Sequence, residues 1–444
     1  MVAGAGPVIF LVVTGVLALG LLWWGFFSLK RKRLLENVPT SKVKGVFLGL
    51  NEVKGRAHRD EPFINFLAQT HCVYYRYEVK ERWSKTERYT DSKGRSQTRT
   101  SSGWKTIASH EERQPFQLVD STGSLRVIPH RAEISADKVF DEHCSRHDPL
   151  YYGKGPSGSI SNSDHRRHFV EHAIPLDARI YVLGPARLRD DRVEPEIAHE
   201  RGAELFLIST RDERQIKRGY TTGAFFKLLV GTVAAFLFPV GFALERAGDF
   251  GKALELQLPV ALPVAGAYLG VILVYYLTLV YNGLVSVRER MEMAASMIDV
   301  QLKRRHVLIP RLVACIQGYA AHERETHRDL AALRVEGARG GGVAARSDLA
   351  ARQGQALTQV FALAEAYPDL DADENFAQLQ RELVNTEDKI ALAREFFNAT
   401  VKALNTRIET LPDVLLAKLG RFKKGDFFAA KGFERSPVRL SFDD

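Results

Sequence analysis

The sequence predicts an α+β membrane protein with three transmembrane helices, an antiparallel β-rich domain and an antiparallel up-and-down bundle of helices. Three features of the 444 residues predict this fold class. Three apolar stretches are long enough to cross a bilayer. Strand-like segments lie between the first stretch and the second, and a helical period follows the third.

The apolar stretches are expected to span residues 8–29, 223–244 and 258–281. The first is apolar apart from Thr14 and Ser28, and at 1.5 Å per residue it is long enough to cross about 30 Å of hydrocarbon. The other two lie close enough together to predict a membrane hairpin. A cleaved signal peptide is the alternative for the first stretch, but its positive charges follow the apolar segment instead of preceding it.

Basic residues beside the apolar stretches predict the orientation, since Lys and Arg near a span stay on the cytoplasmic side. The first stretch is followed at once by four of them, Lys30, Arg31, Lys32 and Arg33. Others precede the second stretch and follow the third. We therefore expect a multi-pass protein of a bacterial inner membrane, with its amino terminus outside and both soluble parts in the cytoplasm.

The net charge and the cysteines argue against nucleic-acid binding and against a disulfide-stabilised or cysteine-based zinc protein. The formal net charge is +9, and much of it lies beside the apolar stretches, so anionic lipid headgroups explain it better than nucleic acid does. The three cysteines, Cys72, Cys144 and Cys315, are far apart and form no CxxC pair. The sequence therefore predicts no disulfide framework, no cysteine-based zinc site and no cofactor.

Residues 36–218 have the pattern of a compact, mostly antiparallel β domain. Segments rich in β-branched and aromatic residues predict its strands at 43–53, 72–83, 116–120, 125–128, 179–184 and 204–209. The polar, turn-rich segment 87–103 predicts a long exposed hairpin or a mobile loop, with Trp83 and Trp104 at its base.

Short motifs in this region resemble the GIDE domain. They are VPTSK at 38–42, CVYYRY at 72–77, TDSKG at 90–94, IYVLG at 180–184 and LISTR at 207–211. The resemblance implies a β module beside a membrane. In a related ubiquitin ligase a cysteine-rich RING domain does the chemistry, and its paired Cys and His zinc ligands are missing here. Ligase activity is therefore not carried over.

After the third stretch the apolar period becomes helical. Residues 376–408 carry apolar side chains at steps of three and four, which include Leu379, Leu383, Ile390, Phe397, Leu404 and Ile408. This seam is expected to form a bundle core or a self-association surface, with partner helices from 297–319 and 349–364. Pro310 should kink or restart the first partner, and the short gaps imply antiparallel neighbours.

Residues from about 270 to 430 resemble the LemA family. The motifs are YNGLV at 281–285, IDVQLKRR at 298–305, LIPRLV at 308–313, AYPDL at 366–370 and NTRIE at 405–409. The family implies a membrane span joined to a cytoplasmic helical bundle with no established enzymatic activity. The bundle is expected at 282–430, and residues 431–444 are expected to form a C-terminal tail.

Two clusters in the β-rich part are candidate sites. Tyr151, Tyr152 and Lys154 suit a lipid or partner contact, as the basic residues 30–33 do, although a structural turn is the favoured interpretation of 148–156. A second cluster comprises His143, His147, His165, His168 and His172. Interleaved charges favour solvated loops over a metal site there. We predict no catalytic residue and no metal ligand.

The favoured function is a non-enzymatic membrane scaffold that self-associates through its helical bundle and organises or remodels the membrane or recruits a partner. The alternative is a membrane-bound enzyme or ligand sensor that acts through the His-rich loop. The expected partners are the lipid bilayer, further copies of the chain and an unidentified protein, but no nucleic acid.

Overall fold

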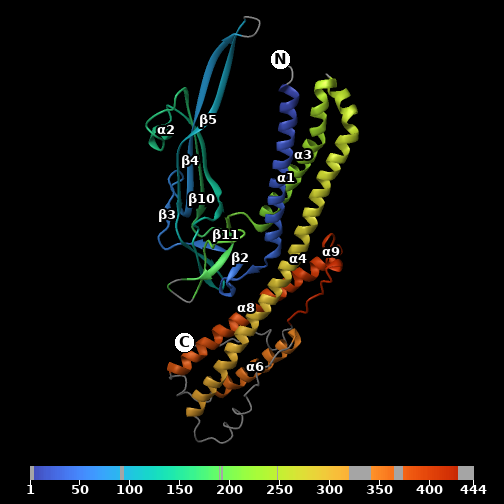
Figure 1. The fold of residues 1–444 in the computed structure, drawn as a ribbon. Helices are drawn as coiled ribbons and strands as arrows, with labels where there is room; N and C mark the ends of the chain where they lie inside the picture. The colour runs from blue at the N-terminus through green and yellow to red at the C-terminus, as the bar shows by residue number, and fades with distance from the viewer. Residues whose placement is uncertain are drawn as a thin grey trace. The chain divides into compact units, whose positions relative to one another are not determined.

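The fold was analysed in a computed structural model that describes residues 5–90, 95–189, 191, 194–247, 249–319, 342–364 and 374–428. It is α+β, with three long apolar helices and a β-rich region (Figure 1). The chain divides into two compact units, Thr40–Gly219 and the combination of Met1–Pro39 with Tyr220–Asp444. The predicted tail at 431–444 and the motif at 366–370 lie outside the described residues, as does the 91–94 part of the TDSKG motif.

The first sheet of the β unit has the strand order β1-β2-β6-β7-β12-β11-β13-β8 in the described part of the chain. Its strands are β1 Thr40–Ser41, β2 Gly49–His58, β6 Phe116–Asp120, β7 Gly123–Val127, β8 Glu133–Ser135, β11 Arg179–Leu188, β12 Pro195–Ile197 and β13 Leu207–Ser209. Because β2 also pairs with β11, the strands β2, β6, β7, β12 and β11 close into a ring. The pairs β1–β2, β7–β12 and β8–β13 are parallel.

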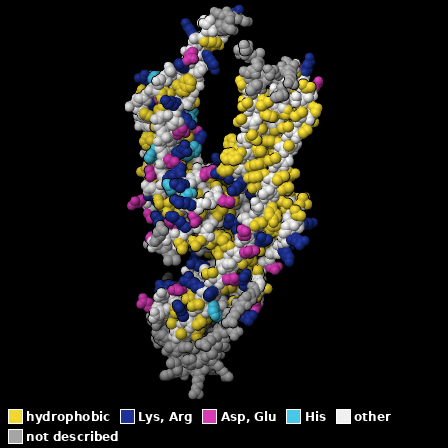
Figure 2. Space-filling model, viewed as in Figure 1, with side chains coloured by type: hydrophobic (Ala, Val, Ile, Leu, Met, Phe, Trp, Pro, Cys, Tyr) yellow, Lys and Arg dark blue, Asp and Glu magenta, His cyan; other side chains and the backbone are white. Residues whose placement is uncertain are grey.

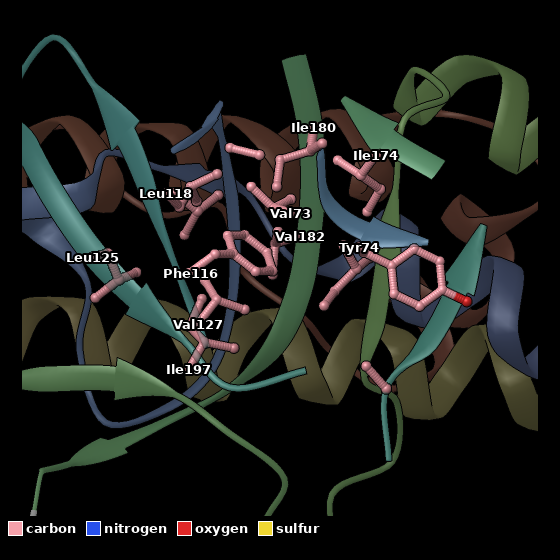
Figure 3. Packing of buried hydrophobic residues seen from close by; sticks show 14 of the residues in the cluster. Val73, Tyr74, Phe116, Leu118, Leu125, Val127, Ile174, Ile180, Val182 and Ile197 are labelled. Atoms are coloured by element: carbon pink, nitrogen blue, oxygen red, sulfur yellow. The ribbon is translucent and has the colours of Figure 1, made fainter. Parts of the chain in front are cut away.

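Apolar side chains from alternate strand positions fill the core of the β unit. Leu118, Val127, Val182 and Ile197 are all fully buried, and Figure 3 shows them facing Val73 from the second sheet. Burying an aliphatic side chain of this size stabilises a fold by about 1.5–3 kcal/mol. The ring is therefore a packed core and not an open channel.

The second sheet has the order β3-β4-β10-β9, with β5 paired to β4, and its described pairs are all antiparallel. Its strands are β3 Phe63–Ile64, β4 His71–Thr90, β5 Ser96–Arg113, β9 Asp137–Ser145 and β10 Ser163–Pro175. The short helix α2, Pro149–Gly153, lies between β9 and β10 in sequence.

Two strand predictions need comment. Within the segment 87–103, the described residues pair as two antiparallel strands, because β4 and β5 pair as far as Thr90 and Ser96. The prediction of a strand over 43–53 is wrong in its first half, where Val43–Gly45 forms a 3-10 turn. Gly49 has a φ of 108°, a left-handed conformation that interrupts extended backbone, and β2 begins only there.

Three described helices are long and apolar enough to cross a membrane: α1 Ala5–Asn37, α3 Glu213–Ala247 and α4 Phe250–Tyr319. Small residues let them approach closely. Ala18 of α1 and Ala234 of α3 are buried against Tyr268 of α4, whose hydroxyl donates to the Ala18 carbonyl at 3.0 Å. Hydrophobic side chains cover the visible face of these helices in a belt with few charges (Figure 2).

The helix α4 continues for 70 residues, from the apolar segment into the polar part of the chain. Pro310 was expected to kink or restart it, but the helix is not restarted there. Burial of the neighbouring Leu308, Ile309 and Leu312 offsets the hydrogen bond that a proline removes. The other described helices of this unit are α6 Val343–Ala364, α8 Glu374–Glu409 and α9 Asp413–Leu419.

Candidate functional sites

A polar cluster, here called the junction, joins the end of α1 to α4, α8 and α9. Its members are Arg33, Asn37, Tyr276, Arg407 and Asp413. Arg407 donates to the Asp413 carboxylate at 2.6 Å and also to the Asn37 side chain. Arg33 donates to the Tyr276 hydroxyl at 2.9 Å and lies 3.6 Å from the other oxygen of Asp413.

The junction is largely shielded from solvent. Asn37 and Asp413 are 5 % and 4 % exposed. Charged groups in such surroundings have to be paired, because the desolvation of each ion costs several kcal/mol. The pairs therefore fix the end of the first apolar helix to the polar helices of the same unit.

The helix α9 carries a stripe of exposed leucines directly beside the junction. Leu415 and Leu419, four residues apart on one face of α9, are 64 % and 82 % exposed, and Leu411, in the turn just before the helix, is 77 % exposed. The opposite face is buried through Asp413 and Ala417. Around the stripe stand the exposed cations Lys418, Arg421, Lys423 and Lys424.

The segment after α9 contacts the part of α4 that follows its apolar stretch. The Phe422 ring meets the Tyr281 ring edge-on at 5.9 Å, and the Arg288 guanidinium lies 5.2 Å from the same phenylalanine ring. Figure 1 shows α9 beside α4. The leucine stripe therefore lies near the point on α4 where the apolar segment ends and the polar segment begins.

The four basic residues after the first apolar stretch lie on α1, which continues to Asn37. Arg31 donates to the Tyr220 hydroxyl at 3.2 Å, and Lys32 pairs with Glu36 at 3.6 Å. Arg33 belongs to the junction, while Lys30 is exposed. Arg33 thus has a fixed place within the fold, in addition to any contact with lipid.

The apolar seam of α8 packs inside the chain. Leu383, Ile390, Phe397 and Leu404 are buried, whereas Leu379 and Ile408 are half-buried. The cluster around Leu383 also contains Leu312 and Ile316 of α4 and Leu357 of α6. These buried side chains pack against other helices of the same chain. Any partner therefore has to bind other faces of the helices.

A buried arginine ties the same three helices together. Arg305 of α4 is 1 % exposed, and it donates to Glu387 of α8 at 3.0 Å. It also donates to the Gln353 side chain at 2.9 Å and to the Ala350 carbonyl at 2.8 Å, both on α6. No pattern in residues 302–305 predicted that Arg305, and not Lys303 or Arg304, is buried.

The segment around Tyr151 is held by a buried ion pair. Tyr151 is fully buried and donates to Glu81 at 3.0 Å. Arg167 pairs with Glu81 at 3.1 Å and donates to the carbonyls of Tyr151 and Gly158, both at 2.6 Å. Gly155 lies so close that a Cβ there would collide with the Tyr151 carbonyl.

Burial alone would raise the pKa of Glu81, but the hydroxyls of Ser163 and Tyr151 and the charge of Arg167 lower it below its ordinary value. Lys154 donates to the Phe66 carbonyl at 2.8 Å. Tyr152, 46 % exposed, is the most accessible of the three predicted contact residues. Tyr151 is not available to a headgroup, because its ring and hydroxyl are enclosed.

The histidines lie mostly on strands and not on the solvated loops predicted for them. His143 is on β9, and His165, His168 and His172 are on β10. His143 and His168 are directly opposite each other, and their rings stack at 3.9 Å. His168 lies 2.6 Å from Asp141.

Asp141 completes a close group with these two histidines. Hydrogen bonds from Lys138 and His168 lower the pKa of Asp141 to about 2. His172 contacts the Ala136 carbonyl at 3.3 Å, and His165 contacts the Tyr151 hydroxyl at 3.4 Å. The structure therefore brings two of the five histidines together.

A basic pocket of about 510 Å³ lies at one end of the first sheet. Its lining includes the cations Lys54, Arg56, Arg179 and Arg211 and the carboxylates Asp120, Asp212 and Glu213. Arg56 and Arg179 are directly opposite on β2 and β11, where like charges repel. In the described chain the guanidinium groups of Arg56, Arg179 and Arg211 take part in no ion pair or hydrogen bond.

A buried acid stands next to this pocket. Glu52 is fully buried and accepts hydrogen bonds from Thr40 and from Tyr181, the latter at 2.8 Å. Burial raises the pKa of Glu52. Lys54 pairs with Glu213 at 2.5 Å. The sequence did not identify this pocket, because only the register of β2 and β11 brings together arginines 123 residues apart.

Comparison with known proteins identifies two segments. Residues 294–442 match the LemA family, and residues 84–238 match the GIDE model, which is described as E3 ubiquitin ligase. The resemblances drawn from the motifs are thus confirmed, although the matched ranges begin and end at different residues. The three cysteines lie on β4, β9 and α4, far too few and too scattered for a RING domain.

The chain is also similar to magnetosome proteins. MamQ of Magnetospirillum gryphiswaldense is 26 % identical over 184 residues, which cover 36 % of this chain and 68 % of that protein. Two proteins of Paramagnetospirillum magneticum, MamQ 1 and MamQ 2, match with the same identity and coverage. Together with the three apolar helices, these matches indicate a membrane-associated protein of LemA type.

Proposed function

Since the chain joins a LemA-family segment to a GIDE segment, we propose that it is a non-enzymatic membrane scaffold. In this proposal it self-associates through its helical part and organises the bilayer around it. The amino terminus is outside and both polar parts are cytoplasmic. The basic residues 30–33 support this orientation, since positive charge beside a span stays on the cytoplasmic side.

The continuity of α4 is the observation that carries the proposal. One helix of 70 residues, Phe250–Tyr319, includes both the apolar segment and the partner of the α8 seam. At 1.5 Å per residue it is about 105 Å long. The junction adds a second attachment, from α1 to α8 and α9. The continuous α4 and the junction together hold the polar helices in a fixed position relative to the apolar helices.

The leucine stripe of α9 supports a direct contact with lipid. An apolar face bordered by cations suits the boundary between headgroups and acyl chains, where the leucines are buried and the cations meet anionic lipid. Leu411, Leu415 and Leu419 have this arrangement. The scaffold therefore holds the membrane by an interfacial helix as well as by its spans.

Self-association uses exposed faces, because the α8 seam is filled within one copy. Val300 and Val307 of α4 are 62 % and 47 % exposed, and they lie seven residues apart on one face. Val384 of α8 is 41 % exposed. A second copy that covers these valines removes apolar surface from water without disturbing the core.

The experiment measures the mass of the full chain in nanodiscs or mild detergent over a range of protein concentrations. An oligomer that Val300→Asp with Val307→Asp dissociates supports self-association. Gln355→Asp with Thr358→Asp, two exposed changes on α6 that add the same total charge, is the control and should leave the oligomer intact. A monomer at every concentration contradicts the proposal.

The basic pocket favours a second candidate function, a sensor of a phosphate-bearing ligand. Two arginines directly opposite each other on a sheet repel, and a bound phosphate would relieve that repulsion by accepting hydrogen bonds from both. Inorganic phosphate or a phosphoinositide vesicle should raise the melting temperature of the full chain, and Arg56→Gln with Arg179→Gln should abolish the shift. No shift with either probe would exclude this function for the pocket.

A further inference from the structure

Three metal-ligating side chains rise from one face of the second sheet. Asp141 and His143 are two residues apart on β9, so they point to the same side. His168 stands opposite His143 on β10. One ligand atom from each of the three can be chosen such that all lie within 4.8 Å of one another.

The donor set suits a transition metal. Two imidazole nitrogens and one carboxylate oxygen are the ligands found in open sites for Zn²⁺ and its neighbours. Bonds of about 2.0–2.1 Å to a tetrahedral ion place the donors about 3.4 Å apart. Asp141 and His143 are exposed, so their side chains have room to turn toward a bound ion.

We infer that Asp141, His143 and His168 bind one divalent transition-metal ion, with Zn²⁺ or Ni²⁺ as suitable probes. Three protein ligands leave at least one coordination position for water, since Asp141 and His143 are exposed. This inference concerns the β unit alone and does not depend on the proposed scaffold function.

A lysine competes with the ion. Lys138 lies 2.6 Å from Asp141 Oδ2 and has to leave when a cation takes its place. Removal of this lysine therefore strengthens metal binding. Because loss of a positive charge favours any cation nearby, this gain supports the site only together with the losses of affinity expected when the histidines are removed.

An aromatic ring beside the cluster provides the readout. The Trp104 ring is 5.5 Å from His143 and 5.9 Å from His168. The other tryptophans are Trp23, Trp24 and Trp83. A paramagnetic ion such as Ni²⁺ bound by the histidines should quench Trp104 fluorescence, and Zn²⁺ should reverse the quenching by competition.

The experiment titrates Ni²⁺ into the full chain, purified without a polyhistidine tag, and counts bound metal by elemental analysis. We expect saturation at one ion per chain, loss of quenching in Trp104→Phe, and at least about tenfold weaker binding in His143→Ala and His168→Ala. Lys138→Gln, which keeps every ligand, should bind more tightly. His172→Ala, on the same strand as His168, is the matched control and should bind as the unaltered protein does.

Two results would overturn the inference. One is equal loss in His172→Ala and His168→Ala, which would indicate diffuse binding by surface histidines. The other is unchanged binding in His143→Ala and His168→Ala. If either alanine variant fails to fold, as judged by its circular dichroism, Lys138→Gln still tests the site: no gain in affinity contradicts it.

Discussion

The Arg407 guanidinium at the end of α8 donates to the Asp413 carboxylate of α9 across 2.6 Å, and the same carboxylate lies 3.6 Å from Arg33 of α1. The Asp413 carboxylate thus pairs with two cations from two different helices. Because its side chain is only 6 % exposed, the solvent can replace neither contact.

Asp413→Ala should therefore destabilise the helical unit strongly. Removing one partner of a buried pair leaves charge without compensation and costs about 3–5 kcal/mol. Glu409→Ala is the matched control, because its pair with Lys424 is more than half exposed and contributes less than about 1 kcal/mol. Thermal unfolding in detergent measures both. Equal losses would show that Asp413 has no special place in the junction.

Two adjacent arginines on α4 provide a second prediction. Arg305 is buried among α6 and α8, whereas Arg304 makes an exposed pair with Glu382 at 3.6 Å. Arg305→Ala should lower the free energy of unfolding by about 3–5 kcal/mol, and Arg304→Ala by less than about 1 kcal/mol. Denaturant unfolding followed by circular dichroism distinguishes them, and similar values for the two would contradict the assignment.

The apolar seam of α8 was predictable from the sequence, whereas the burial of Arg305 and not Arg304 was not. The period of α8 predicted an apolar seam, and Leu383, Ile390, Phe397 and Leu404 are buried as such a period requires. The positive-inside rule treats every Lys and Arg near a span alike, so it does not distinguish Arg305 from Lys303 and Arg304. Which arginine is buried depends on the rotation of α4 against α6 and α8, and that is a property of packing.

The β unit was predictable in its local pairs and not in its long-range ones. The hairpin of β6 and β7 followed from a short turn between two apolar segments. The closure of β2 onto β11 joins segments more than a hundred residues apart and sets Arg56 opposite Arg179. The same is true of His143 and His168, whose approach depends on the register of β9 and β10.

The buried pair of Glu81 and Arg167 predicts a specific pH dependence. The folded pKa of Glu81 is lowered from an ordinary value of 4.5, so ionised Glu81 stabilises the fold above that pH. This stability is lost as the pH falls through the lowered pKa. Glu81→Gln should cost about 3 kcal/mol at pH 7, and its difference from the unaltered chain should shrink below pH 4.5.

Melting temperatures measured between pH 7 and pH 3 test this sign. Glu87→Gln is the control on the same strand: Glu87 is 61 % exposed in its pair with Lys85, so solvent screens the pair and its removal should change the pH profile far less. A difference between Glu81→Gln and the unaltered chain that stays constant with pH would contradict an ionised Glu81.

The leucine stripe of α9 gives the last prediction, that Leu415 enters the lipid. Full transfer of a leucine side chain from water is worth about 1.5–3 kcal/mol, enough for three leucines to hold the helix at the interface. An environment-sensitive fluorophore on Leu415→Cys, in a Cys315→Ser background, should be quenched by spin-labelled lipid. Cys72 and Cys144 are buried and can remain.

Arg381→Cys is the matched control for this measurement. It is exposed on α8 and lies 28 residues before the junction end of that helix, about 40 Å along the axis. A label at Arg381 should stay in water and resist the same spin-labelled lipid. If the labels at 415 and 381 are quenched to the same small extent, α9 does not touch the bilayer, and its exposed leucines then mark a contact surface for another protein.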